Sequence, residues 1–231
     1  MELLRAAGLG LGTTTRLDLR TPAGERRTVA LAPSTEPRRE WLWLGGAAPL
    51  WERRPDEEFW SERWPDGTVY VNWRGYEKLA DASSRLLADL DRERPRRLIV
   101  DLRDNGGGDY NKGRAFIAEI AKRPWLNRKG VLYVLTGRAT FSASMTNAVD
   151  FQKQTRATLA GEPPGARPNN WQEGRRFSLK HSGLPVSVST RYYRFMDRDT
   201  DALRPALKLP PVPSDWGADR DLAVRRILAV R

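Results

Sequence analysis

The sequence predicts an α/β fold, a mostly parallel sheet built from crossover (βαβ) connections and flanked by further β elements. Two observations carry this prediction. Between residues 68 and 160, apolar runs suited to buried strands alternate with helical patterns, an order that implies right-handed crossovers. Two of these strands also run directly into a glycine turn at 106–108 and a serine-bearing helix start at 142.

The first third of the chain is less regular. Residues 1–33 contain two strand-like runs, 15–20 and 27–31. A hairpin buries little surface alone, so this segment is expected to be docked on something or to be a remnant. Residues 34–67 form a tryptophan- and proline-rich connecting segment in which Trp41–Leu44 alternate as strand residues do. We interpret the tryptophans as a covering layer over the sheet.

The regular core is predicted over residues 68–205. It starts with a strand at Thr68–Trp73 and an amphipathic helix over 76–92. The further expected elements are a strand at 98–102, a helix at 112–122, a strand at 131–135, a helix at 142–155, a strand at 157–160 and a hairpin at 177–179 and 186–189. Residues 206–231 are expected to form a proline-rich tether and a terminal helix.

Composition limits the possible partners. The net charge is +11, but the arginines that carry most of it are interleaved with acids, and no basic stripe with stacking aromatics is present. Nucleic acid is therefore not an expected partner.

No apolar run is long enough for a membrane span, and the start lacks a signal-peptide pattern. We expect a cytoplasmic protein as written, exported if the true N-terminus lies upstream. The absence of cysteine excludes disulfides and thiolate metal sites.

The glycine turn is the first feature that could support chemistry. Gly106, Gly107 and Gly108 follow a buried strand, and ligands of open α/β sheets bind outside the carboxyl ends of strands. Glycines let the backbone approach a substrate closely and aim N–H groups at a developing oxyanion. The alternative is a tight connection that needs a positive φ.

Ser142 is the second feature. It lies where the strand at 131–135 gives way to a helix, so free backbone N–H groups surround it and can stabilise an anion. The alternative is that Ser142 only caps the helix, a role for which Thr140 and Ser144 compete.

The third feature is a proline loop, residues 161–169, after the strand at 157–160. Pro163 and Pro164 fix its backbone, as a loop that frames a substrate requires. By the logic of the sheet it lies at the same edge as Ser142. The alternative is a simple connection.

Together the segments 101–108, 141–144 and 161–163 resemble, in order and spacing, motifs of the C-terminal processing or tail-specific proteases. This serine peptidase family includes retinoid-binding-protein-like domains. The resemblance covers about residues 68–205 and extends more loosely back to about residue 40. Residues 1–33 are similar to the end of the PDZ-type peptide-binding domain that precedes the core in this family.

The resemblance implies that Ser142 is the nucleophile. The N–H of Ala143 and one from the glycine turn, Gly106 or Gly107, would hold the oxyanion, and no metal or organic cofactor is implied. The family's general base is a lysine 25 residues after the serine, where this sequence has Arg167. A guanidinium stays protonated at any usable pH and cannot accept the serine proton.

Three groups are candidates for a replacement base. Glu173 follows the proline loop closely, His181 is the single histidine, and an acidic cluster spans Asp197–Asp201. A carboxylate base would need its pKa raised by burial. Lys153 is excluded because it lies about three helical turns after Ser142.

Two functions remain open. The first is hydrolysis of a peptide or protein substrate, held near Gly161, Glu162, Arg167 and Asn169 of the proline loop. The second is a catalytically impaired relative that binds peptides or an apolar ligand, in which Arg167 pairs with a terminal carboxylate.

Overall fold

The computed structural model describes residues 14–21, 23–32, 48–212, 215 and 221–230. The chain divides into two compact units, Met1–Gly45 and Gly46–Arg231. In the first unit, β1 (Thr15–Arg20) and β2 (Arg26–Leu31) pair as an antiparallel hairpin, as predicted. The strand expected at Trp41–Leu44 lies outside the described residues.

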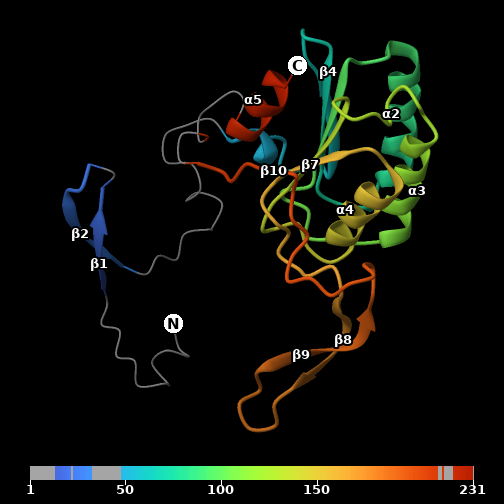
Figure 1. Cartoon of the computed structure of the whole chain (residues 1–231). Coiled ribbons are helices and arrows are strands. Elements are labelled where there is room, and N and C mark those ends of the chain that lie inside the picture. The colour runs from blue at the N-terminus through green and yellow to red at the C-terminus, as the bar shows by residue number, and fades with distance from the viewer. Residues whose placement is uncertain (1–13, 22, 33–47, 213–214, 216–220, 231) are drawn as a thin grey trace. The chain divides into compact units, whose positions relative to one another are not determined.

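The second unit is built on a six-stranded sheet in the order β10-β7-β6-β5-β4-β3 (Figure 1). Only the β3–β4 pair is antiparallel, and the other neighbours are parallel. The strands are β3 (Phe59–Arg63), β4 (Thr68–Trp73), β5 (Arg97–Asp101), β6 (Leu132–Thr136), β7 (Thr158–Gly161) and β10 (Leu207–Lys208). The predicted α/β fold class is therefore confirmed.

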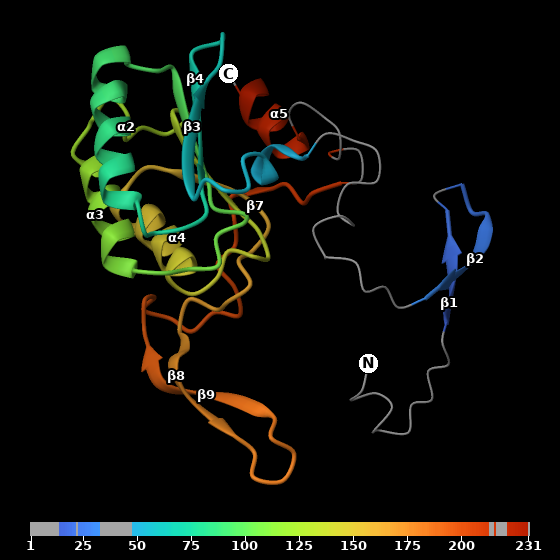
Figure 2. The same cartoon turned by 180° about the vertical axis from the view of Figure 1, so that it is seen from behind.

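Helices cover both faces of this sheet (Figures 1 and 2). One face packs against α2 (Leu79–Glu93), α3 (Tyr110–Ala121) and α4 (Ala143–Gln154). The other packs against α5 (Leu222–Ala229) and the short 3-10 helix η2 (Leu50–Glu52). Alternation along β5 divides the two cores, because Leu98 and Val100 face one and Ile99 the other.

The sheet extends beyond the predicted range of 68–205 at both ends. In β3, Trp60 packs on Tyr70 with ring centroids 5.3 Å apart, and β10 pairs with β7 at the opposite edge. Both edge strands are short and flanked by charged residues or proline. Their apolar pattern is too brief to separate them from loop on sequence alone.

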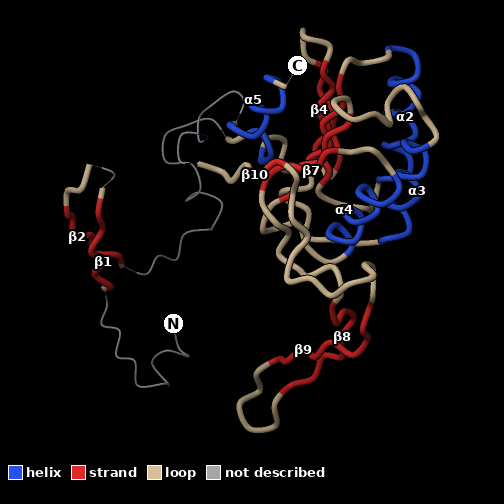
Figure 3. Tube along the Cα trace, in the orientation of Figure 1, coloured by secondary structure: helices blue, strands red, loops and turns tan. Residues whose placement is uncertain are grey.

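A long antiparallel hairpin, called the arm below, projects from the core (Figure 3). It consists of β8 (Asn170–Ser178) and β9 (Pro185–Tyr193), and most of its residues are exposed. The predicted hairpin at 177–179 and 186–189 is thus the outer part of a much longer element. Polar and charged residues dominate the inner part, which hides the strand pattern.

A buried ion network ties α5 to the sheet. The guanidinium of Arg103 donates to Asp101 at the end of β5, at 2.5 Å, and to Asp221 at 2.8 Å. Asp221 also caps α5 by accepting from Val224 N. Burial would lower the pKa of Arg103, but the two carboxylates outweigh it and hold that pKa well above its usual value.

Candidate active site

The glycine turn lies directly against the start of α4. A Cβ placed on Gly107 would meet Ser142 Cβ at 2.7 Å and the Phe141 carbonyl oxygen at 2.9 Å. Gly107 also has φ +106°, a conformation that favours glycine. Only a residue without a side chain therefore allows the turn to approach the serine this closely.

Asn105 fixes the position of this turn. Its side-chain Oδ1 accepts from Gly107 N at 2.9 Å, while its Nδ2 donates to Trp73 O at 2.9 Å. Its carbonyl accepts from Phe141 N at 3.0 Å. Because one residue joins the turn, strand β4 and the residue before Ser142, these three segments keep a fixed relation.

Ser142 occupies the N-cap position of α4 but does not cap it. Its side chain makes no capping hydrogen bond, and its backbone has φ 52° and ψ −125°. A non-glycine residue in such a region costs on the order of 1–3 kcal/mol, and this strain is concentrated at functional sites. Ala143 is the first residue of α4, so its N–H has no partner within the helix.

Backbone hydrogen bonds connect the proline loop to the end of β6 and to the serine loop that follows it, residues 137–142. Glu162 N donates to Thr136 O and Gly165 N donates to Thr140 O, both at 3.0 Å. The Thr140 hydroxyl binds between Gly137 N and Leu102 O. The three loops that the sequence placed at one edge of the sheet are therefore joined there.

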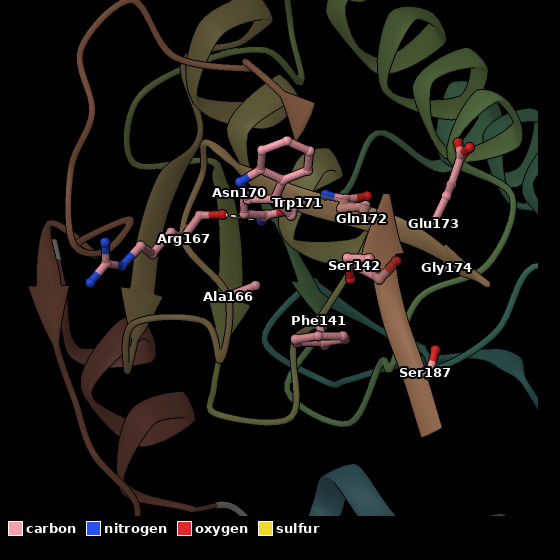
Figure 4. Close-up of a pocket in the computed structure, with 11 residues that line it drawn as sticks. Phe141, Ser142, Ala166, Arg167, Asn170, Trp171, Gln172, Glu173, Gly174 and Ser187 are labelled. Atoms are coloured by element: carbon pink, nitrogen blue, oxygen red, sulfur yellow. Dashed lines mark hydrogen bonds between the residues drawn. The ribbon is translucent and has the colours of Figure 1, made fainter. Parts of the chain in front are cut away.

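Ser142 lines a pocket of about 380 Å³ between these loops and the arm (Figure 4). The serine and proline loops contribute Phe141, Ser142, Ala166 and Arg167. The arm contributes Asn170, Trp171, Gln172, Glu173, Gly174, Ser187 and Ser189.

Arg167 stands at the predicted place of the base, on the wall of this pocket. Its carbonyl accepts from the Asn170 side chain, and its guanidinium extends away from Ser142 (Figure 4). No ion pair of Arg167 is present among the described residues.

Glu173 lines the same pocket, but its carboxylate also extends away from Ser142 (Figure 4). The side chain is 61% exposed, lies 3.8 Å from Arg191 and accepts a hydrogen bond from the Tyr193 hydroxyl. That hydrogen bond raises the pKa of Tyr193. The burial that a carboxylate base needs is absent at Glu173 in this conformation.

Of the predicted substrate-binding residues in the proline loop, some are buried in the fold and one forms a surface ion pair. Asn169 is buried, and its amide binds Met196 O, Asp199 Oδ1 and the backbone N–H groups of Phe195 and Met196. The Asn169 bond is the main cause that lowers the pKa of Asp199. Gly161 is buried against the Thr136 carbonyl, and Glu162 pairs with Arg138 at 3.3 Å.

The other candidate bases do not reach the serine's pocket. His181 lies at the tip of the arm, between β8 and β9. Within the acidic cluster, Asp201 pairs with Arg204 at 2.6 Å and Asp197 lies 3.9 Å from Lys153. The roles predicted for the site residues stay predictions.

Several residues of the site are not evident from the sequence. Asn105 had a signal, since an asparagine before glycines often fixes a turn. Ser187 and Ser189 alternate with valines in β9, which indicates a shared face but not what it adjoins.

Comparison with known proteins bears on the fold. No family model and no curated protein sequence matches this chain. Among solved structures, a peptidase-like protein from Parabacteroides merdae aligns with a TM-score of 0.53 and 14% identity over 75% of this chain. A serine-to-alanine variant of CPAF aligns with a TM-score of 0.51 and 11% identity over 87% of this chain.

The photosystem II D1 C-terminal processing protease also aligns, with a TM-score of 0.48 and 18% identity over 95% of this chain. The chain spans 64% of the length of each of these three structures. By their names these neighbours include a C-terminal processing protease and a peptidase-like protein, and at these identities the likeness concerns the fold alone. Every helix within the described residues is too short or too polar to cross a bilayer.

Proposed function

We propose that this chain carries the core of a serine peptidase of the tail-specific type, in which Ser142 attacks the peptide carbonyl. The peptide would lie in the pocket between the proline loop and the arm. The N–H of Ala143 and an amide of the glycine turn would stabilise the oxyanion.

One observation carries the proposal: Ser142 is strained and leaves its hydroxyl unused for capping. An ordinary cap has extended backbone and binds an N–H of the first turn. Ser142 instead has φ 52°, makes no such bond and lines the pocket beside Gly107. Backbone strain without a local hydrogen-bond gain is typical of a functional position.

The proton of Ser142 needs an acceptor other than Arg167. Glu173 is the one carboxylate among the described lining residues of the pocket. Rotation of this side chain away from Tyr193 and into the pocket would bring its carboxylate toward the Ser142 hydroxyl, as general-base catalysis requires. Glu173 is therefore the base in this proposal.

The test is covalent labelling with a fluorophosphonate probe, read by mass spectrometry, together with digestion of a defined peptide mixture. We expect the probe on Ser142 and cleavage that disappears in Ser142→Ala. Ser182→Ala is the matched control, because it removes an exposed hydroxyl at the tip of the arm. Glu173→Gln should abolish cleavage and leave peptide binding intact. Labelling and cleavage that persist in Ser142→Ala would refute the proposal.

A second candidate function, a peptide-binding module without catalysis, rests on one observation. The position 25 residues after Ser142 holds a guanidinium, which cannot act as a base. Arg167→Lys separates the two functions. If the wild type is inert and the lysine variant cleaves, the site binds peptides and lacks only its base.

A further inference from the structure

The arm has two different faces, and one of them adjoins Ser142. Along the regular strand β9, Ser187, Ser189 and Arg191 share one face because side chains alternate. Ser187 and Ser189 line the pocket that holds Ser142. We call this the groove face. The cross-strand register adds Gly174 and Arg176 to it, since Gly174 pairs with Ser189 and Arg176 with Ser187.

The opposite face of the arm carries large apolar side chains, of which Trp171 at the inner end also borders the pocket. Trp171 and Tyr192 are cross-strand partners whose rings lie 5.4 Å apart. Val188 follows on this face, paired with Arg175. Arg175 and Arg176 are thus adjacent in sequence and both exposed, but they point to opposite sides of the same hairpin.

Arg176 is the cation at the outer end of the groove face. It makes no ion pair or hydrogen bond with any described side chain. Arg191, on the same face, lies 3.8 Å from Glu173 and stacks at 4.8 Å over the Tyr193 ring. No described carboxylate pairs with Arg176, so its positive charge is uncompensated whether Glu173 binds Tyr193 or turns into the pocket.

We infer that Arg176 selects peptides with an acidic side chain a few residues from the bond at Ser142. The inference rests on the proposed function and names its substrate class. Gly174, Ser187 and Ser189 present small side chains, so an extended peptide can lie over this face. From Arg191 to Ser187, the partners of Gln172 and Arg176, strand β9 advances about 13 Å, the length of about four residues of an extended peptide. The acidic side chain is thus placed about three to five residues from Ser142.

The test measures binding and cleavage separately. Binding of labelled peptides of about twelve residues, which extend over about 40 Å, is measured by fluorescence anisotropy on the Ser142→Ala protein. Each peptide carries one glutamate or, as its partner, one glutamine at successive positions. We expect tighter binding of the glutamate peptide by about 1.5- to five-fold at the selected position, as for an exposed ion pair. The preference should shrink as salt screens the charges.

Charge-reversal variants on the two faces of the arm test whether Arg176 causes the preference for an acidic peptide. Arg176→Glu should remove or invert the preference, whereas the matched control Arg175→Glu should keep it. Equal loss in both variants, or an unchanged preference in Arg176→Glu, would overturn the inference. Failure of the proposed function has a different signature, in which peptides bind with the Arg176-dependent preference but the wild type cleaves none. If no peptide binds at all, both are overturned.

Discussion

The buried ion network around Arg103 gives the sharpest prediction for stability. The substitution is Arg103→Met, which keeps an unbranched apolar stem but removes the charge. In the wild type the Arg103 side chain is 6% exposed, and its two partners, Asp101 and Asp221, are 0% and 1% exposed. The variant leaves both carboxylates buried without a cation.

Removing one partner of a buried ion pair costs about 3–5 kcal/mol. Here two carboxylates lose the same partner, so we expect the upper part of that range at neutral pH. For a unit of this size, this corresponds to a fall in Tm of about 8–20 °C. The loss should shrink in acid, because carboxylates buried without a partner take up protons and the folded state then gains stability as the pH falls.

The assay is thermal unfolding followed by circular dichroism at neutral and acidic pH. Arg92→Met is the matched control, because its guanidinium is 67% exposed and pairs with Asp89 on the surface of α2. It should leave the free energy of unfolding almost unchanged, because an exposed ion pair contributes little. Adding Asp221→Asn to Arg103→Met should recover part of the loss, since one charge disappears and the cap remains. A Tm of Arg103→Met within about 2 °C of the control would refute the reasoning.

Three further predictions concern the site and its surroundings. Ser142→Gly should be more stable than Ser142→Ala by about 1–2 kcal/mol, because glycine tolerates φ 52°; the opposite order in chemical denaturation would show that the backbone there carries no strain. Gly107→Ala should lose about 2 kcal/mol more than Gly130→Ala, since both have positive φ but only Gly107 faces Ser142; equal losses would contradict the close contact. Burial raises the pKa of Asp150, so the wild type loses stability as the pH rises from about 4, the unfolded value, through that raised pKa. Asp150→Asn should therefore be the more stable protein at neutral pH and lose this difference in acid, and a variant that is less stable at every pH would count against it.

The central fold could be predicted from the sequence because its signals are local. Short apolar runs such as Leu98–Leu102, separated by helical patterns, require buried parallel strands. The turn residues that follow the strands lie at one edge of a parallel sheet whatever the details of packing. This is why the sequence alone predicts that Ser142 and the glycine turn lie near one another.

The acid–base capacity of individual side chains could also be predicted from the sequence. Arginine at position 167 excludes that side chain as a base, since the pKa of a guanidinium is far above any working pH. By contrast, the choice between cap and nucleophile for Ser142 needed its backbone angles and its missing hydrogen bond, which no residue pattern encodes.

The contacts between residues that are far apart in the sequence could be known only from the tertiary structure. Arg103 and Asp221 are 118 residues apart and pair only when α5 packs on the sheet. The face on which Arg176 lies depends on the register of the arm, and a slip of one residue would exchange it with Arg175. The sequence by itself determined the strands, the turns and the chemical capacity of each side chain, because these depend on near neighbours. Pairing, orientation and burial depend on contacts between remote segments, so they were decided only by the folded chain.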